Sequence, residues 1–272
     1  MNSVPATTTP YFPLTLYDLS MCCAMMGFIV LLAWQGKYGI TKTLLWGALR
    51  AGIQLLAVGY ILTWLFSVDY FVVVFFVLMI QSFVAAWQAS RRQKIKIANL
   101  PLYLWVAIAG SSFVFLFFSF VFVIHPDPLW KGQVVIPISG MVIGNALNSA
   151  ALSADRLVAE LRSRRDQVEA ALAFGASPWE ASFEPRRDAL HAAVAPSMNS
   201  MFVVGIVQLP GMMTGQIIGG VPPTEAVRYQ ILIMYLITAA CFGTAWIVER
   251  LTWRKIGAAA GVWLDEHVTD NA

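Results

Sequence analysis

The stretch that decides the fold is VEAALAFGASPWEA at residues 168–181. It belongs to a polar insert, residues 155–188, that lies between two long apolar, glycine-rich segments. Gly175 suits the left-handed cap that ends many helices, and Ser177 followed by Pro178 is typical of a helix N-terminus. We therefore predict two short helices joined by a tight corner. The alternative interpretation is a solvated loop that only connects two membrane spans.

Apolar residues recur through this insert at a roughly helical spacing, while arginine and acidic residues cover the remaining surface. The apolar residues are Leu161, Val168, Leu172 and Phe174. A corner of this kind at a membrane surface would expose alanine, leucine and phenylalanine. It would offer a convex apolar knob that another protein could bind.

The composition indicates an integral membrane protein. The chain is 58% hydrophobic and 12% charged, with a mean hydropathy of +0.68, well outside the range of soluble domains. Its 272 residues leave no room for a separate soluble catalytic domain once the spans are subtracted. Cys22, Cys23 and Cys241 lie in apolar segments, where small buried hydrophobes are a better interpretation than metal or redox chemistry. No Lys or Arg precedes the first apolar run, so we expect a retained helix and not a secretory signal.

Apolar runs of about 20 residues, each long enough to cross a bilayer as a helix, predict an all-α polytopic bundle of seven transmembrane helices. The runs are 14–34, 44–66, 70–88, 102–124, 132–154, 197–219 and 226–248. We expect one permease domain over 1–272, with the helical insert at 155–190 between helices five and six. The tail, 256–272, is expected to fray.

The basic residues predict the orientation. With the N-terminus outside, all of the 18 Lys and Arg residues lie on the inner side except Lys131, Arg228 and Arg50. We therefore predict N-out, C-in topology. The insert is then cytoplasmic.

Predicted spans five and six share a pattern of proline, glycine, methionine and amide. Its members are Pro137, Gly140, Met141, Gly144 and Asn145 in span five, and Pro210, Gly211, Met212, Gly215 and Gln216 in span six. Proline kinks a helix, and glycines four apart let another helix approach closely. Together with Asn148 and Gln208, the amides need partners or water inside the membrane. The pattern favours a gated transport path, although a tight static bundle would use the same residues.

Other candidates are less specific. Met141, Met212 and Met213 could be soft metal ligands, but His125, His191 and His267 form no cluster, so adaptable packing is favoured and the metal site stays unknown. In span two, Arg50 and Gln54 are four residues apart and share a helix face. Arg50 either extends to the inner interface or lines the path.

The sequence contains no motif for nucleotide hydrolysis or for another catalytic reaction. There is no Gly-Lys-Ser/Thr phosphate loop, no His-Glu-x-x-His and no Gly-x-Ser-x-Gly, so we predict no catalytic residue and no enzyme activity in this chain. No paired carboxylates lie inside the spans; Asp18 is the one acidic residue near a span interior. Uphill transport would need a partner that supplies energy.

Five runs together resemble the FetB/YbbM-type permease family, the membrane subunits of ABC transporters implicated in iron export, with plant relatives linked to aluminium tolerance. These runs are RAGIQLLAVGYIL (50–62), IPISGMVIGNALNSAAL (136–152), LAFGASPWEA (172–181), LPGMMTGQIIGG (209–220) and EAVRYQILIMY (225–235). The insert is also similar to the EAA loop of ABC importers, whose coupling helix docks into the ATPase. Glu169, Ala170, Ala171 and Gly175 match it, and Leu172, Phe174 and Ser177 complete the predicted coupling surface.

The resemblance implies two copies of this chain and two separately encoded ATPase chains in a bacterial inner membrane. ATP and magnesium would bind the partner, this chain would hold no cofactor, and its contacts would be lipid and protein with no nucleic acid. Iron or a related metal would be the exported substrate. Two alternatives stay open: a passive or ion-gradient-driven channel or carrier, and a structural or sensory membrane subunit.

Overall fold

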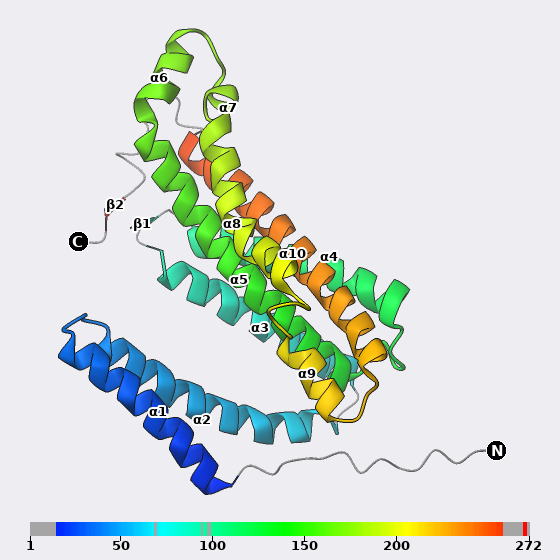
Figure 1. The fold of residues 1–272 in the computed structure, drawn as a ribbon. Coiled ribbons are helices and arrows are strands. Elements are labelled where there is room, and N and C mark those ends of the chain that lie inside the picture. Colours follow the sequence, from blue (N-terminus) through cyan, green and yellow to red (C-terminus); the bar gives the residue numbers. More distant parts are fainter. Residues whose placement is uncertain (1–14, 68–69, 94, 97–98, 258–268, 271–272) are drawn as a thin grey trace. The chain divides into compact units, whose positions relative to one another are not determined.

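The computed structural model describes residues 15–67, 70–93, 95–96, 99–257 and 269–270 (Figure 1). Contacts divide the chain into two compact units. Unit 1 comprises Met1–Asp69 and Gly215–Val221, and unit 2 comprises Tyr70–Thr214 and Pro222–Ala272.

Unit 1 is built on an antiparallel hairpin of α1 (Leu16–Gln35) and α2 (Thr41–Leu65), which pack against each other. The Thr15 hydroxyl accepts from the backbone N–H of Asp18, whose carboxylate accepts from the Thr15 N–H, so a capping box starts α1. Most side chains of the hairpin are exposed, because two helices alone cannot cover each other. Our expectation that Cys22 and Cys23 are buried is therefore wrong: both are exposed on α1.

Unit 2 is a helical bundle with α5 at its centre. Its helices are α3 (Phe71–Arg91), α4 (Leu100–Ser119), the π-helical turn η1 (Phe120–Ile124), α5 (Gly132–Ser163), α6 (Arg165–Ala173), α7 (Pro178–Ala181), α8 (Phe183–Val203) and α10 (Pro223–Gly257). The residues of the short helix α9 (Gly211–Ile218) are divided between the units: those up to Thr214 belong to unit 2 and those from Gly215 to unit 1. Figure 1 shows α8 and α10 beside α5, which also packs against α3 and α4.

The only strands in the described part of the chain are β1 (Ile95–Lys96) and β2 (Thr269–Asp270), which pair antiparallel. They depart slightly from the expected all-α fold. Of the predicted frayed tail, only the end of α10 and β2 fall within the described residues.

Six described helices are long and apolar enough to cross a membrane, one fewer than predicted. These candidate spans are Leu16–Gln35, Thr41–Leu65, Phe71–Arg91, Leu100–Ile124, Gly132–Ser163 and Pro223–Ile256. The predicted sixth span, 197–219, is not a continuous helix. The end of α8, an irregular segment over 204–210 and the short helix α9 share that stretch.

The break after α8 has a local cause. Gly205 adopts a left-handed backbone (φ +83°), and its N–H donates to the Gln208 carbonyl at 2.9 Å. Pro210 has no N–H to donate and disfavours a helical conformation at Leu209. The predicted span rested on hydropathy, which measures the apolar composition of this segment and takes no account of the helix breakers Gly205 and Pro210. Pro137, in contrast, lies inside α5, which continues past it.

Small residues form much of the core of unit 2. Ala107, Ala146, Ala150 and Ala189 are all fully buried within it. Serine hydroxyls add bonds between helices: Ser111 Oγ donates to the Ala240 carbonyl (3.0 Å), Ser149 Oγ to that of Ala193 (3.0 Å) and Ser153 Oγ to that of Ala245 (2.9 Å). Backbones that approach this closely leave little space for larger side chains.

Among the glycines of unit 2, Gly243 of α10 has the least space around it. A Cβ there would lie 2.5 Å from Ser111 Oγ and 3.2 Å from Phe115 Cε2. We expect Gly243→Ala to destabilise unit 2 by about 1–3 kcal/mol, because the added carbon overpacks the contact between α4 and α10. The control is Gly110→Ala, since nothing lies within 4 Å of a Cβ at Gly110. Thermal unfolding of both variants in detergent measures the difference, and equal midpoints would contradict the packing described.

Candidate functional site

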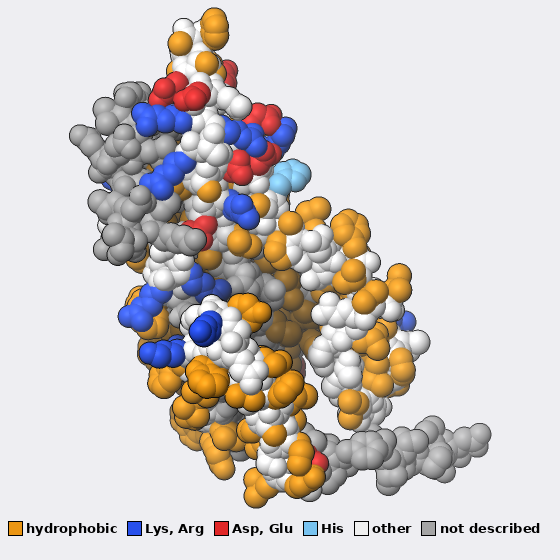
Figure 2. Space-filling view, turned by 60° about the vertical axis from the view of Figure 1, so that its left-hand side comes forward, with side chains coloured by type: hydrophobic (Ala, Val, Ile, Leu, Met, Phe, Trp, Pro, Cys, Tyr) orange, Lys and Arg blue, Asp and Glu red, His pale blue; other side chains and the backbone are white. Residues whose placement is uncertain are grey.

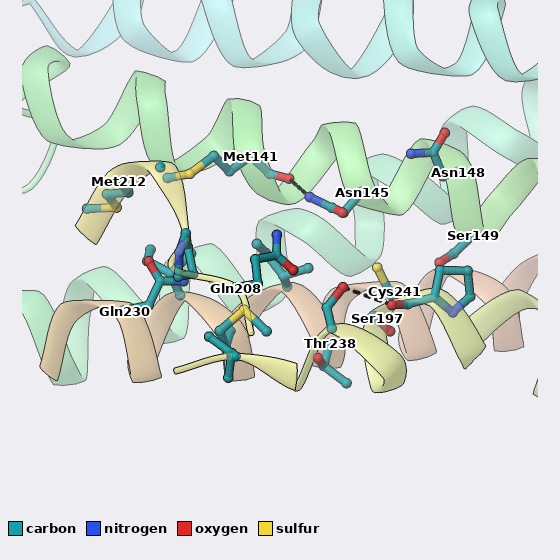
Figure 3. Close-up of a pocket in the computed structure, with 18 of the residues that line it drawn as sticks. Met141, Asn145, Asn148, Ser149, Ser197, Gln208, Met212, Gln230, Thr238 and Cys241 are labelled. Atoms are coloured by element: carbon teal, nitrogen blue, oxygen red, sulfur yellow. Dashed lines mark hydrogen bonds between the residues drawn. The ribbon is translucent and has the colours of Figure 1, made fainter. Parts of the chain in front are cut away.

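A cavity of ≈ 270 Å³ lies in unit 2 between α5, α8, the break after α8 and α10 (Figure 3). In the close-up, Met141, Asn145, Asn148 and Ser149 line it from α5. Gln208 enters from the break, and α9 contributes Met212 at its first turn.

The cavity brings together five of the residues predicted to line a path: Met141, Asn145, Asn148, Gln208 and Met212. Pro210 and Gly211, predicted hinge residues, also line it. Met213 is not among the lining residues, and Arg50, Gln54 and Gln216 belong to unit 1. A Cβ at Gly144 or Gly211 would meet nothing within 4 Å, and one at Gly140 only Gln81 Nε2 at 3.7 Å. Close helix packing at those glycines therefore stays a prediction.

The wall that α10 provides was not predicted from the sequence. Its side chains are Gln230, Ile233, Met234, Ile237, Thr238 and Cys241. Cys241 is buried, as expected, but its place in the cavity was not foreseen. The polar residues of α10 are isolated within an apolar helix, so no local pattern could have assigned them to this wall.

Hydrogen bonds fix how the two asparagines of α5 face the cavity. Asn145 Nδ2 donates to the Met141 carbonyl at 2.8 Å. Arg92 Nη1 donates to Asn148 Oδ1 at 3.0 Å. A carbonyl can only accept and a guanidinium can only donate, so both amide orientations are determined. Among the described residues, the Asn145 side-chain oxygen and the Asn148 NH₂ group have no hydrogen-bond partner.

The hydroxyl groups of the wall present oxygen lone pairs. Each serine donates its hydrogen to a backbone carbonyl: Ser149 to Ala193 (3.0 Å), Ser197 to Val194 (2.8 Å) and Ser200 to Pro196 (3.0 Å). Gln230, 6% exposed, and Thr238 have buried oxygens, Oε1 and Oγ1, without a hydrogen-bond partner among the described residues. A ligand that supplies O–H or N–H donors would satisfy these oxygens.

The lining carries no Asp, Glu, Lys, Arg or His. The described residues also contain no group of three or more His, Cys, Asp or Glu side chains placed to hold a metal ion. Hard cations prefer carboxylate oxygens, which this cavity lacks. The described lining therefore offers neutral hydrogen-bonding groups and no carboxylate ligand set for a hard cation.

At the far end of α5 the predicted helical corner is present. α6 ends at Ala173, Gly175 is left-handed (φ +91°), and the Ala176 N–H donates to the Ala171 carbonyl at 3.1 Å. Ser177 and Glu180 then form the capping box that starts α7. Hydrogen bonds from the Ser177 hydroxyl and N–H lower the pKa of Glu180. The predicted left-handed helix cap at Gly175 and the predicted helix start at Ser177 and Pro178 are confirmed.

The predicted coupling residues occupy different positions on the corner. Phe174 is 94% exposed at the tip, and Ala170 and Gly175 are also exposed. Glu169 pairs with Arg165 at 2.7 Å along α6. Leu172 is partly buried against the core. The apolar stripe therefore divides: Leu161, Val168 and Leu172 pack inward, and Phe174 projects.

Ion pairs support the base of the corner, and Figure 2 shows acidic and basic side chains gathered below its apolar tip. Arg164 Nη2 contacts Asp188 Oδ2 of α8 at 2.5 Å and Glu160 Oε2 of α5 at 3.3 Å. The bond to Arg164 holds the pKa of Asp188 below its usual range. A buried pair, Arg186 with Glu249 of α10, was missed from sequence because 63 positions separate its members.

The chain matches the family model described as Uncharacterised protein family (UPF0014) over residues 16–256. It is 34% identical to the probable iron export permease protein FetB of Escherichia coli, over 88% of this chain and 90% of that one. It is 38% identical to UPF0014 membrane protein slr1647 of Synechocystis, over 81% and 85% respectively. Protein ALUMINUM SENSITIVE 3 of Arabidopsis thaliana is 27% identical, over 82% and 81%. No solved structure matches the chain. The predicted resemblance is confirmed.

Thr238→Val tests whether the cavity binds a ligand. Valine has the shape of threonine, and the Thr238 hydroxyl has no partner among the described residues, so unfolding should be unchanged within about 1 kcal/mol. Transport should fall about three- to tenfold if that hydroxyl bonds the substrate. In the control, Ser111→Ala, loss of the bond to Ala240 should lower stability by about 1 kcal/mol without this loss of transport. Unchanged transport in Thr238→Val would exclude substrate contact there.

Proposed function

Because this chain belongs to the UPF0014 family of membrane proteins, we propose that it is the permease subunit of an ATP-driven ABC transporter that exports iron or a related metal. A separately encoded ATPase binds ATP and magnesium and supplies the energy. Two copies of this chain form the membrane part of the complex. The corner at Gly175 lies on the cytoplasmic side of a bacterial inner membrane and contacts the ATPase.

The observation that carries this proposal is the corner. Phe174 exposes 94% of its surface at the tip of a segment whose backbone is fixed by a left-handed glycine and a capping box. A large apolar side chain on a backbone that is already fixed is typical of a binding anchor, because little backbone entropy is lost when a partner binds it. A loop that only connected two helices would have no use for such a side chain.

The lining of the cavity favours a metal bound in a complex, and not a bare metal ion, as the substrate. Its polar groups are neutral amides and hydroxyls, together with the sulfur atoms of methionine and Cys241, and the charged side chain bonded to its lining is a cation, Arg92. A bare divalent or trivalent cation would meet no compensating carboxylate there. The E. coli relative is named a probable iron export permease, so we propose that this chain carries iron with its own ligands attached.

The second candidate function is a passive or ion-gradient-driven channel or carrier. Proton-coupled carriers use ionisable groups inside the membrane. The neutral lining of the cavity favours the ATP-driven proposal, and dependence on an ATPase separates the two.

Phe174→Ser tests the docking role of the tip. The side chain is almost fully exposed, so folding should be unaffected, while affinity for the ATPase should fall about tenfold or more through loss of an aromatic anchor. Co-purification with the ATPase encoded by a neighbouring gene measures this. The control is Tyr229→Ser, an exposed aromatic near the start of α10, at the opposite end of unit 2 from the corner. Equal loss in both variants would argue against a specific anchor.

Metal accumulation tests the transport itself. Cells that express the chain with its ATPase should hold less iron than cells without the gene, and an ATPase that cannot hydrolyse ATP should abolish the difference. A difference that persists with the disabled ATPase would favour the passive carrier. Unchanged content of iron and of other metals would refute metal export.

A further inference from the structure

Arg186, near the start of α8, is a charged side chain held inside the protein. It is 7% exposed and its Nη1 donates to Glu249 Oε1 of α10 at 3.1 Å. Glu249 is 6% exposed. Burial of two charges is expensive unless their geometry is well satisfied, so this pair constrains the two helices to one relative position.

Two tryptophans complete the contact. Arg186 Nη2 donates to the Trp179 carbonyl of α7 at 3.0 Å, and the guanidinium lies 3.1 Å from the centroid of the Trp179 ring. The rings of Trp179 and Trp253 meet edge to face with centroids 4.6 Å apart. Trp253 Nε1 donates to Ser182 Oγ at 2.8 Å. We call Arg186, Glu249, Trp179, Trp253 and Ser182 the Arg186 cluster.

The Arg186 cluster joins the corner to α10. Trp179 lies in α7, directly after Gly175 and the cap, while Glu249 and Trp253 lie in α10. The second polar attachment of the corner, the ion pair of Arg164 with Asp188, is about 30% exposed on each side chain. Ion pairs in contact with water hold their partners weakly. The buried cluster is therefore the firmer of the two connections.

From the cluster, α10 leads to the cavity without interruption. It is one helix from Pro223 to Gly257, and Cys241 in the cavity wall lies about 12 Å along the axis from Glu249. The same helix carries Thr238 and Gln230 into that wall. α8, in contrast, ends at Val203, before the break. α8 also reaches the cavity wall, through Ser197 and Ser200, but Pro196 lies inside that helix. α10 has no proline after Pro223, so a displacement at the corner would pass along it to the cavity as a rigid body.

We propose that Arg186 is a positioning residue that couples the corner to the cavity through α10. This inference rests on the proposed function, because the displacement would come from the bound ATPase. When the ATPase moves the corner, the Arg186 cluster moves the α10 wall of the cavity with it and changes how Gln230 and Thr238 face the substrate.

The test uses the complete complex with its ATPase in lipid vesicles. The double variant Arg186→Met/Glu249→Met removes both charges of the pair together, so neither Arg186 nor Glu249 is left as a buried charge without the other, and folding should be retained. The matched control is Arg187→Met/Glu184→Met, an exposed pair one position further along α8. We expect the double variant to bind ATPase and hydrolyse ATP, yet to lose most transport. The control should transport normally.

Cys241 provides a native reporter of the α10 wall. Its modification by N-ethylmaleimide, followed by peptide mass spectrometry, should differ several-fold between the nucleotide-free and vanadate-trapped complexes of the wild type. The double variant should lose this difference, while the control should keep it.

Wild-type transport together with a wild-type Cys241 response in the double variant would overturn the role of Arg186 and leave the proposed function standing. Failure of the wild-type chain to bind any ATPase would overturn both. If the double variant does not fold, Arg186→Lys replaces it. Lysine keeps the charge beside Glu249 but lacks the planar fork that also reaches the Trp179 carbonyl. Normal coupling in that variant would equally overturn the proposal.

Discussion

Close contact between small residues around α5 is the constraint on which unit 2 depends. In a bilayer, apolar side chains gain little by leaving lipid, so helices associate through tight packing and interhelical hydrogen bonds. Ala146, Ala150 and Ala154 form one buried row on α5. By helical geometry, Met141, Asn145 and Asn148 lie on the opposite face, which lines the cavity. One helix thus separates a dry packed interface from a polar cavity.

The irregular segment over 204–210 can remain non-helical because it lies next to that cavity. Backbone groups without helical partners are costly in lipid but tolerated where they line a polar space or bond within the protein. Gly205 closes the segment onto Gln208, and Gln208 and Pro210 both line the cavity. Transporters commonly place such discontinuous helices at their binding sites. The break that removes a continuous span is therefore part of the site.

Most charged side chains of unit 2 lie where the free-energy cost of burying a charge is avoided. The cavity lining is neutral, whereas paired arginines and carboxylates concentrate around the corner. Most of these pairs touch water and contribute little to stability. Arg186 and Glu249 differ because both are buried and shared among α7, α8 and α10. A pair of this kind fixes relative position more than it adds free energy of folding.

The sequence by itself determined the membrane class, the resemblance to the family and the corner, because hydropathy, Gly175 and the Ser177–Glu180 cap act locally. It also placed Met141, Asn145, Asn148, Gln208 and Met212 among the candidates for one site. The sequence contains both residues that break the predicted sixth span, Gly205 and Pro210, but the span was predicted from its apolar composition and Pro210 was interpreted as a kink. Only the tertiary structure decided which face of α10 completes the cavity, where Gly243 meets Ser111 and how Arg186 finds Glu249. These contacts join helices distant in sequence, and no local periodicity encodes which helices become neighbours.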